Sequence, residues 1–443
     1  MAVKVLDFIL PNWADMIDAS FKWERLHDAC SCVIDCPHST PKYDEQGDYF
    51  VARTQDIRTG CFDSRNAARV NQITYEERIK RCQPIKGDIL YSREGTYFGD
   101  AALIEYDNIC LGQRMVLLRP EVANYDPLYV VYWLNSIFMK RHLQGLRDGT
   151  VAERLNMSTI RSLPIARPSL KTQQAIAHIL GTLDDKIELN RRMNETLEAM
   201  AQALFKSWFV NFDPVKAKME GKQPEGMDAE TAALFPDKLV ESELGLIPEG
   251  WEVLPLSKTI KLIGGGTPKK SVPEYWGGDI PWFSIKDMPN GSDVFITETD
   301  LLITDKGLKK SSAKLLPVGT TIISARGTVG KLGIVHKPMA MNQSCYGVVG
   351  TDVYGPYFNY YNLNSAVQTL MNNTHGAVFD TITRKTFDTY SWAFPNASLA
   401  SSYEEIVEPI MQRIAQNVEL NSELQQARDT LLPKLISGEL EVQ

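Results

Sequence analysis

Four side chains near the N-terminus have the types, and part of the spacing, that a zinc site requires. Cys30, Cys32, Cys36 and His38 lie within nine residues of one another, and thiolate sulfur and imidazole nitrogen are the usual ligands of structural zinc. No second Cys or His pair lies nearby in sequence to complete a tetrahedral site. Because the seven cysteines are odd in number and spread over a long chain, we expect reduced thiols and no bound metal.

Two further stretches resemble nucleotide or base chemistry only in outline. An amino-methyltransferase holds a flipped base with an Asp/Asn-Pro-Pro-aromatic run, whereas the nearest string here is NFDPV at 211–215. The stretch LIGGGTPKKS at 262–271 lacks the Gly-Lys-Ser/Thr ending of a phosphate loop. We interpret its glycines as a flexible turn that brings Lys269 and Lys270 towards a backbone phosphate, and we expect no catalytic residue in this chain.

The distribution of charge favours a polyanionic partner despite a net charge of −8. Residues 212–252 hold ten acidic and four basic residues, so this connector alone carries −6. The window 306–337 holds seven Lys or Arg and no acid. Basic residues beside polar loops are typical of a phosphate-binding surface, although a charged run is often only a solvated face.

The candidate DNA contacts are side chains in loops that occur in both halves of the chain. Arg can bind guanine bidentately, and Gln or Asn can bind adenine. We expect more than half of the candidates to be phosphate contacts or ordinary surface residues. They are Arg93, Thr96, Gln113, Arg114, Thr150 and Arg154 in the first half, and Lys269, Lys270, Lys286, Arg326, Thr328, Lys331, Asn342 and Gln343 in the second.

The elements that must position these loops are two long helices with a matched apolar seam. The stretches IELNRRMNETLEAMAQALF at 187–205 and VELNSELQQARDTLLPKLI at 418–436 share Glu-Leu-Asn, and steps of four and three residues are typical of a coiled coil. Amphipathic helices that each line their own domain are the alternative. The predicted seam is Ile176, Leu180, Leu183, Ile187, Asn190, Leu197 and Leu204, with Val407, Met411, Ile414, Val418, Asn421, Leu432 and Leu435.

Several residues bear on the limits and outer faces of these helices. Gly181 should weaken the first helix, and Pro409 and Pro433 should restrict the regular part of the second to Pro409–Leu432. A capping box at Ser402 and Glu405 would instead give an earlier start with a kink. We also predict that Trp208 and Phe209 lie on an outer face that binds a partner subunit.

The segments before the two helices repeat as well. GDILYSREGTYFGDAALI at 87–104 can be laid over GTTIISARGTVGKLGIV at 319–335, and both predict a strand, a polar loop with Gly-Thr, and a second strand. Gly112-Gln113 corresponds to Asn342-Gln343, and Trp23-Glu24 corresponds to Trp251-Glu252. The chain is therefore predicted to be an α+β protein, a mixed strand-and-helix domain followed by a long helix, written twice.

The connectors resemble a known family. ALFKSWFVNFDPVKAK at 203–218, LFPD at 234–237 and ELGLIPEGWE at 243–252 are similar to the central region of specificity (S) subunits of type I restriction-modification systems. LLPKLISGEL at 431–440 is similar to the second conserved region of that family. The resemblance implies target recognition domains at 1–168 and 248–396, long conserved helices at 169–211 and 397–443, and an acidic connector at 212–247. It also implies that the helices pair as an antiparallel coiled coil with a pseudo-twofold internal repeat.

The resemblance further implies a non-catalytic subunit that recognises a bipartite, asymmetric site on double-stranded DNA, with one half read by each domain. Two modification subunits would bring S-adenosylmethionine and adenine-N6 methylation, and restriction subunits would bring ATP, Mg and cleavage. We expect a cytoplasmic protein, because no apolar run approaches the roughly 20 residues of a membrane span. The alternatives are a self-contained DNA-modifying enzyme and a coiled-coil scaffold without DNA specificity.

Overall fold

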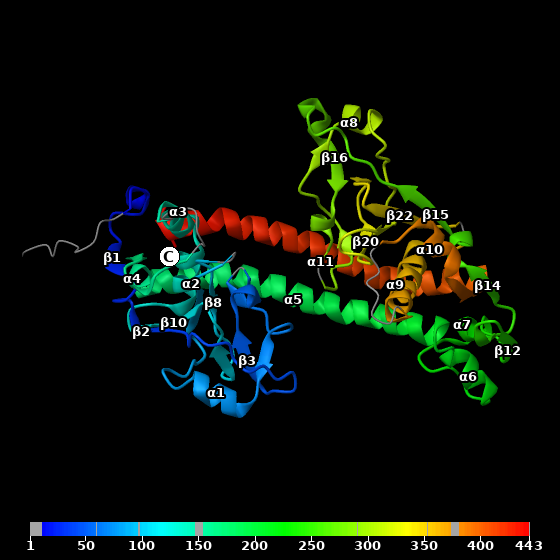
Figure 1. Ribbon diagram of the computed structural model, residues 1–443, viewed down its shortest axis with the longest axis horizontal. Coiled ribbons are helices and arrows are strands. Elements are labelled where there is room, and N and C mark those ends of the chain that lie inside the picture. Colours follow the sequence, from blue (N-terminus) through cyan, green and yellow to red (C-terminus); the bar gives the residue numbers. More distant parts are fainter. Residues whose placement is uncertain are drawn as a thin grey trace, which may run out of the picture. The chain divides into compact units, whose positions relative to one another are not determined.

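The chain forms two compact units, and each contains part of both long helices. The computed structural model describes residues 11–442 except 59, 96–97, 147–153, 290, 352 and 374–380. One unit comprises residues 1–185 and 424–443, and the other comprises residues 186–423. The long helices are α5 (Leu170–Phe209) and α11 (Ala397–Ser437), coloured green and red in Figure 1. Among the described residues, no helix is long and apolar enough to cross a bilayer.

The first domain, β1 to β11, has a four-stranded antiparallel sheet of order β2-β10-β7-β8 and a three-stranded sheet of order β6-β3-β9. Small pairs of strands, β1 with β11 and β4 with β5, complete it. The strands are β1 (Lys22–Arg25), β2 (Cys30–Asp35), β3 (Tyr49–Ala52), β4 (Ile57–Arg58), β5 (Cys61–Phe62), β6 (Ala68–Val70), β7 (Ile89–Ser92), β8 (Ala101–Leu103), β9 (Ile109–Leu111), β10 (Met115–Pro120) and β11 (Pro164–Arg167). The helices are η1 (Ala14–Met16), η2 (Thr54–Asp56), α1 (Gln72–Arg78), α2 (Pro127–Asn135), α3 (Ile137–Gly145) and α4 (Met157–Arg161).

The second domain, β14 to β23, has a five-stranded sheet of order β15-β22-β19-β20-β17 and a three-stranded sheet of order β18-β16-β21. Its strands are β14 (Glu252–Pro255), β15 (Ile260–Gly264), β16 (Trp276–Phe283), β17 (Phe295–Ile296), β18 (Leu302–Ile303), β19 (Thr321–Ser324), β20 (Leu332–Val335), β21 (Ala340–Met341), β22 (Cys345–Gly350) and β23 (Ser391–Phe394). Its helices are η3 (Leu256–Lys258), η4 (Pro273–Tyr275), η5 (Ile285–Asp287), α8 (Asp305–Lys309), α9 (Pro356–Asn373) and α10 (Arg384–Thr389). The connector holds α6 (Asp213–Met219), α7 (Ala229–Ala233), β12 (Leu239–Ser242) and β13 (Gly245–Pro248).

The internal repeat is confirmed at the level of strand pairing. The sheet β2-β10-β7-β8 corresponds to β15-β22-β19-β20, and β1-β11 corresponds to β14-β23. In each domain the smaller sheet contains one parallel pair, β3 with β9 or β16 with β21. A capping box follows β3 in the first domain, with Asp56 in η2, and follows β16 in the second, with Asp287 in η5. The two halves therefore share one backbone frame, and the predicted mixed α+β repeat is correct.

The long helices pair antiparallel in each unit. In the first unit, Arg428 Nη1 lies 2.7 Å from Asp184 Oδ1, and Leu435 and Ile436 share a core cluster with Ile176 and Leu180. All the predicted seam side chains are buried or half-buried, as expected for an apolar stripe covered by a partner helix.

Buried asparagines hold the middle of the second unit's helix pair. Asn190 Nδ2 donates to Asn421 Oδ1 at 2.9 Å, so the two residues that occupy equivalent places in the repeat meet each other. Asn417 Nδ2 donates to Asn194 Oδ1 at 2.8 Å, and Asn194 Nδ2 donates to Asp293 Oδ1 at 3.2 Å. Polar pairs of this kind fix helix register because a slipped register would leave buried amides without partners.

The expected interruption of the second helix at its prolines is wrong. Helix α11 runs unbroken from Ala397 to Ser437 through both prolines. It starts ahead of the expected capping box, because Asn396 Oδ1 accepts the backbone N–H of Leu399. Helix α5 continues through Gly181, where a Cβ would come within 3.0 Å of Leu128 in α2. The small residue therefore permits close packing of α2.

Trp208 and Phe209 do not lie on an exposed partner surface. They are 3% and 1% exposed, and both contact the buried ring of Tyr403 in α11. Phe209 also packs on Trp251 and Phe358 of the second unit. The end of α5 is therefore an anchor for the second domain, and aromatic residues there serve the chain's own core.

A buried ion pair in the first domain gives a test of the core. Asp88 is 1% exposed and accepts two hydrogen bonds from Arg119, at 2.7 and 2.8 Å. Arg119→Met should lower the free energy of unfolding by about 3–5 kcal/mol, because Asp88 would keep a buried charge without its partner. Urea denaturation of the full chain measures the change. The exposed pair of Arg65 and Asp63 is the control, since Arg65→Met should cost less than about 1 kcal/mol, and equal losses would contradict the assignment.

Candidate nucleic-acid interface

Four segments of the first domain meet at an open pocket, and one of them is the loop after β2 that carries Cys36 and His38. The loop after β7 is tied to the turn between β9 and β10, since the N–H of Arg93 donates to the carbonyl of Arg114 at 3.0 Å. The same loop holds the fourth segment, since the N–H of Leu155 donates to the carbonyl of Arg93 at 2.8 Å and Glu94 forms a β-bridge with Arg154. The pocket has a volume of about 230 Å³ and is lined by Cys36, His38, Arg93, Glu94, Gln113, Arg114 and Arg154.

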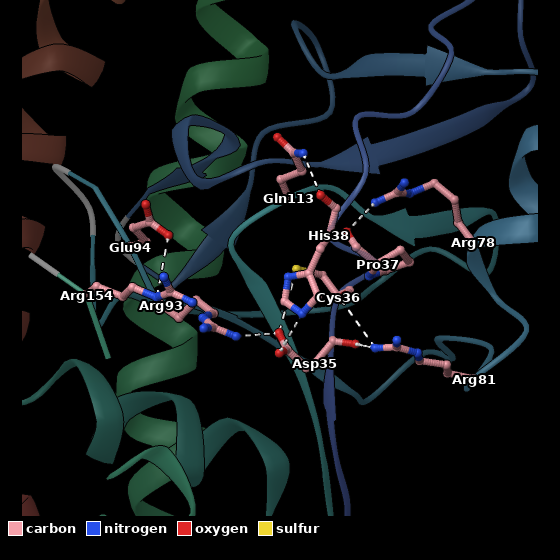
Figure 2. Close-up of polar contacts among 10 residues, drawn as sticks. All are labelled: Asp35, Cys36, Pro37, His38, Arg78, Arg81, Arg93, Glu94, Gln113 and Arg154. Atoms are coloured by element: carbon pink, nitrogen blue, oxygen red, sulfur yellow. Dashed lines mark hydrogen bonds and ion pairs between the residues drawn. The ribbon is translucent and has the colours of Figure 1, made fainter. Parts of the chain in front are cut away.

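Arg93 lines the pocket, but its side chain is buried and not solvated. Arg93 is 4% exposed, and its Nη1 lies 2.6 Å from Asp35 Oδ1, as Figure 2 shows. Asp35 also lies 3.4 Å from His38 Nε2. A guanidinium that is buried and paired with a carboxylate is poorly placed to contact DNA, so the geometry supports a structural contribution of Arg93 to the pocket.

Other arginines that sequence reasoning passed over hold the loop that carries His38. Arg78 is 7% exposed, and its Nε and Nη1 donate to the carbonyls of Leu111 and Ser39 at 2.7 and 3.0 Å. Arg81 Nη1 donates to the carbonyl of Asp35 at 3.2 Å. Gln113 Nε2 donates to the carbonyl of His38 at 3.1 Å, so one predicted DNA contact also braces this loop (Figure 2). The sequence gives no sign of these contacts, because their acceptors are backbone carbonyls of segments that only the fold brings close.

The cysteine and histidine motif does not come together as the spacing suggested. Within the described chain, the group compact enough to hold a metal ion is Asp35, Cys36 and His38. Cys32 points elsewhere, with its Sγ 4.0 Å from Cys82 Sγ. Burial raises the pKa of Cys36 and raises that of Cys30 to about 12. Asp35 Oδ1 is already paired with Arg93 Nη1, at 2.6 Å.

Besides the exposed His38, two arginines of the first-domain pocket are exposed, Arg114 and Arg154. Their side chains are 57% and 53% exposed, and both guanidinium groups lie near the carboxylate of Glu94. Glu94 was not among the predicted contacts, although its place beside Arg93 in the repeated loop could have drawn attention to it. Thr96 and Thr150 lie outside the described residues.

The second domain repeats this arrangement with different side chains. The N–H of Ala325 donates to the carbonyl of Ser344, the N–H of Ile382 donates to the carbonyl of Ala325, both at 2.9 Å, and Arg326 bridges Thr381. These bonds match those of Arg93, Leu155 and Glu94, so Arg326 is equivalent to Glu94, Ser344 to Arg114, and Thr381 to Arg154.

The remaining second-domain candidates divide into exposed and braced side chains. Asn342 is half-buried, and its Oδ1 accepts the N–H of Ser344 at 2.9 Å. Gln343 is exposed but accepts a hydrogen bond from the hydroxyl of Thr267. The exposed cations and hydroxyl are Lys269, Lys270, Lys286, Arg326, Lys331 and Thr328.

The glycines at 264–266 are not a flexible turn, contrary to our expectation. A Cβ on Gly265 would overlap the carbonyl of Asn342, and a Cβ on Gly266 would overlap the backbone at Ala313. Gly266 is also fixed by its own backbone, whose N–H donates to the carbonyl of Met341 and whose carbonyl accepts from Trp282 Nε1, both at 2.9 Å. The glycines allow close packing of segments, and the packed backbone holds the chain that leads to Lys269 and Lys270.

Comparison with known proteins agrees with this repeated architecture. The family model for the type I restriction modification DNA specificity domain matches residues 34–199 and 248–427. The type I restriction enzyme HindI specificity subunit of Haemophilus influenzae is 32% identical over 404 residues, covering 80% of this chain and 87% of that protein. The MjaIX specificity subunit of Methanocaldococcus jannaschii is 26% identical over 328 residues, covering 71% and 69%.

A solved structure gives the same assignment at the level of the fold. The S subunit of a type I restriction-modification system from M. genitalium aligns with a TM-score of 0.55 at 15% identity, covering 97% of this chain and 98% of that chain. Two matched copies of the family's domain, a relative above 30% identity and a shared fold lead to one assignment. This chain belongs to the family of type I restriction-modification DNA specificity proteins.

Proposed function

We propose that this chain is the DNA specificity subunit of a type I restriction-modification complex, and that each domain reads one half of a bipartite, asymmetric site on double-stranded DNA. The observation that carries the proposal is one backbone frame used twice with different side chains at equivalent loop positions. Glu94, Arg114 and Arg154 in one domain stand where Arg326, Ser344 and Thr381 stand in the other. A shared frame keeps the mode of docking, while different side chains read different bases.

The exposed side chains supply the electrostatic part of binding. Lys269, Lys270, Lys286 and Lys331 are exposed in the second domain. Phosphate contacts from such residues give affinity and register without reading sequence. Residues 212–252, which hold none of these cations, carry −6 of the net charge of −8, so the net charge does not exclude DNA as the partner.

The chemistry is assigned to partner subunits. Two modification subunits would bind S-adenosylmethionine and methylate adenine N6, and restriction subunits would use ATP and Mg for translocation and cleavage. This chain contributes recognition and the helix pair that joins its two domains, with no catalytic residue of its own.

Methylome sequencing of cells that carry this chain with its modification subunit tests the proposal. The expected motif is bipartite, with unequal halves and a methylated adenine on each strand. Binding of S-adenosylmethionine by the purified chain alone would favour a self-contained modifying enzyme. Binding of DNA without sequence preference would favour a scaffold. Either result would replace the proposed function.

Arg326→Ala probes the second domain. If Arg326 contacts a base, the variant should lose roughly 1–3 kcal/mol of affinity and relax one position of one half-site. Competition binding with single-substitution DNA duplexes measures both quantities. Lys258→Ala, which removes an exposed lysine of η3 in the same domain, is the control for lost positive charge. Equal weakening on every duplex would reassign Arg326 to a phosphate.

A further inference from the structure

The carboxylate of Glu94 lies between two guanidinium groups, one at each oxygen. Arg114 Nε is 3.6 Å from Oε1, and Arg154 Nε is 4.0 Å from Oε2. N–H···O hydrogen bonds in proteins span about 2.7–3.2 Å, so these contacts orient the arginines without saturating them. The side chain of Glu94 is 25% exposed, and those of Arg114 and Arg154 are more than half exposed. The trio therefore presents a donor, an acceptor and a second donor in order.

The backbone fixes this order. Glu94 and Arg154 face each other across a β-bridge, and the carbonyl of Arg114 is bound by the N–H of Arg93. Arg114 has a φ of 68°, a left-handed conformation that residues with a Cβ adopt at a cost. Strain of this kind persists only where the surroundings enforce it, and it is concentrated at functional sites. The turn thus keeps an arginine where glycine would be easier to accommodate.

The order donor, acceptor, donor is complementary to one kind of base pair. In the major groove an A·T pair presents adenine N7 as an acceptor, the N6 amino group as a donor and thymine O4 as an acceptor. A G·C pair presents two acceptors, N7 and O6, and then the N4 donor of cytosine. The central position is an amino group only in A·T, and a central carboxylate faces it favourably.

We propose that Glu94, Arg114 and Arg154 read one A·T pair in the half-site of the first domain. Glu94 accepts from adenine N6, and the two arginines donate to adenine N7 and thymine O4. The inference rests on the proposed function, because it assumes that this domain docks in a major groove. It goes further by naming the base pair and the three residues that select it.

The second domain gives an internal comparison. Arg326, Ser344 and Thr381 occupy the equivalent positions, so the central acceptor is replaced by a guanidinium flanked by hydroxyls. A guanidinium in the central place suits the paired acceptors N7 and O6 of guanine. The same frame is therefore set for different base pairs in the two domains.

The test is methylome sequencing of cells carrying the full-length chain with its modification subunit, as wild type and as three variants. Glu94→Ala should relax one A·T position of one half-site by roughly 5- to 150-fold, with every other position retained. Arg114→Gly should relax the same position, and it should fold normally because glycine tolerates the left-handed φ. Glu94→Gln keeps a carbonyl acceptor and should retain most of the preference. Glu121→Gln and Arg141→Ala, exposed residues of the same domain, are matched controls and should leave the motif unchanged.

The outcomes separate this inference from the proposed function. A wild-type motif that none of the three variants alters would overturn the reading by Glu94 and leave the specificity function intact. Relaxation at a G·C position would overturn the choice of base pair. An unchanged motif, together with tighter binding of purified Glu94→Ala protein to every duplex in competition binding, would show that Glu94 only moderates the positive charge. Absence of any wild-type motif would overturn the proposed function and the inference together.

Discussion

Exchanging residues 248–396 for the second recognition domain of another family member is expected to change one half of the methylated motif and to leave the other half intact. The physical reason is that the exchanged segment enters and leaves the domain on adjacent strands. Glu252 of β14 pairs with Phe394 of β23 in antiparallel register, so both junctions lie side by side. The first domain has the same construction, since Lys22 of β1 pairs with Arg167 of β11.

The exchange must preserve the contacts that seat the second domain on its helices. Glu404 of α11 accepts the backbone N–H groups of Tyr357 and Phe358, each at 2.9 Å. Backbone donors do not depend on sequence, so a new domain can supply them. Asp293 is different, because its side chain accepts from the buried Asn194. The graft should therefore keep an acid or amide at this position, as well as Asn396 at the start of α11.

Methylome sequencing of the hybrid beside both parents measures the outcome. The reciprocal exchange of residues 1–168 is the matched control, and it should alter the opposite half. Two hybrids that each alter a different half would support independent readers. Changes in both halves after a single exchange would contradict independent reading. A hybrid that retains Asp293 and yields less stable protein than either parent would point to further seating contacts.

The internal repeat and the helix seam could be predicted because both appear as regular spacing of residues along the sequence. Asn190 and Asn421 occur 231 residues apart and form a direct hydrogen bond, as the matched phase required. An apolar stripe on a helix requires apolar residues at steps of four and three, and these steps can be found in the sequence alone. Asn417 as a partner of Asn194 follows from the antiparallel register, because Asn194 lies four residues after Asn190 and Asn417 lies four residues before Asn421. The second partner of Asn194 could not be found in this way, because Asp293 belongs to a distant loop that no period relates to the helices.

Several residues lie in surroundings that the sequence did not predict, because the residues that cover them are distant in the chain. Arg93 was a candidate DNA contact, yet its side chain is buried and pairs with Asp35 at the end of β2. Trp208 and Phe209 were expected at a partner surface, because an aromatic end of a helix gives no sign of which side is covered. Tyr403 and Phe358, far away in sequence, cover them. Glycines 265 and 266 were interpreted as flexible, whereas the absence of a Cβ serves close backbone packing.

A chain truncated near residue 215 is expected to form an antiparallel dimer through α5. Such a chain keeps the first domain and α5 but loses α11, which leaves Ile176, Leu180, Leu183, Ile187, Leu197 and Leu204 without a partner. Exposing that stripe to water is unfavourable, so two copies should pair antiparallel. Subtracting the repeat offset of 231 from Leu435 and Ile436 gives Leu204 and Phe205. These residues of the second copy would cover Ile176 and Leu180.

The polar middle of the seam decides how well the truncated pair fits. Asn190 would meet its own copy at a true twofold axis, and an amide pair can satisfy itself there. Asn194 would face Lys186 of the other copy, the equivalent of Asn417 after subtraction of 231, and would lack Asp293. We therefore expect a dimer with the register of the intact chain and a weaker polar network.

A twofold dimer must present two identical readers in opposite directions, so it should recognise an inverted repeat of the first half-site. Sedimentation of the truncated chain should show a dimer, and methylome sequencing with the modification subunit should show a palindromic motif. Asn190→Lys in the truncated chain is the matched control. It would place two lysines against each other at the axis, and like charges at a buried seam oppose pairing, so this variant should sediment as a monomer and direct no methylation. A stable monomer without that substitution, or a dimer directed to an unrelated asymmetric motif, would show that the seam does not set the relation between the two readers.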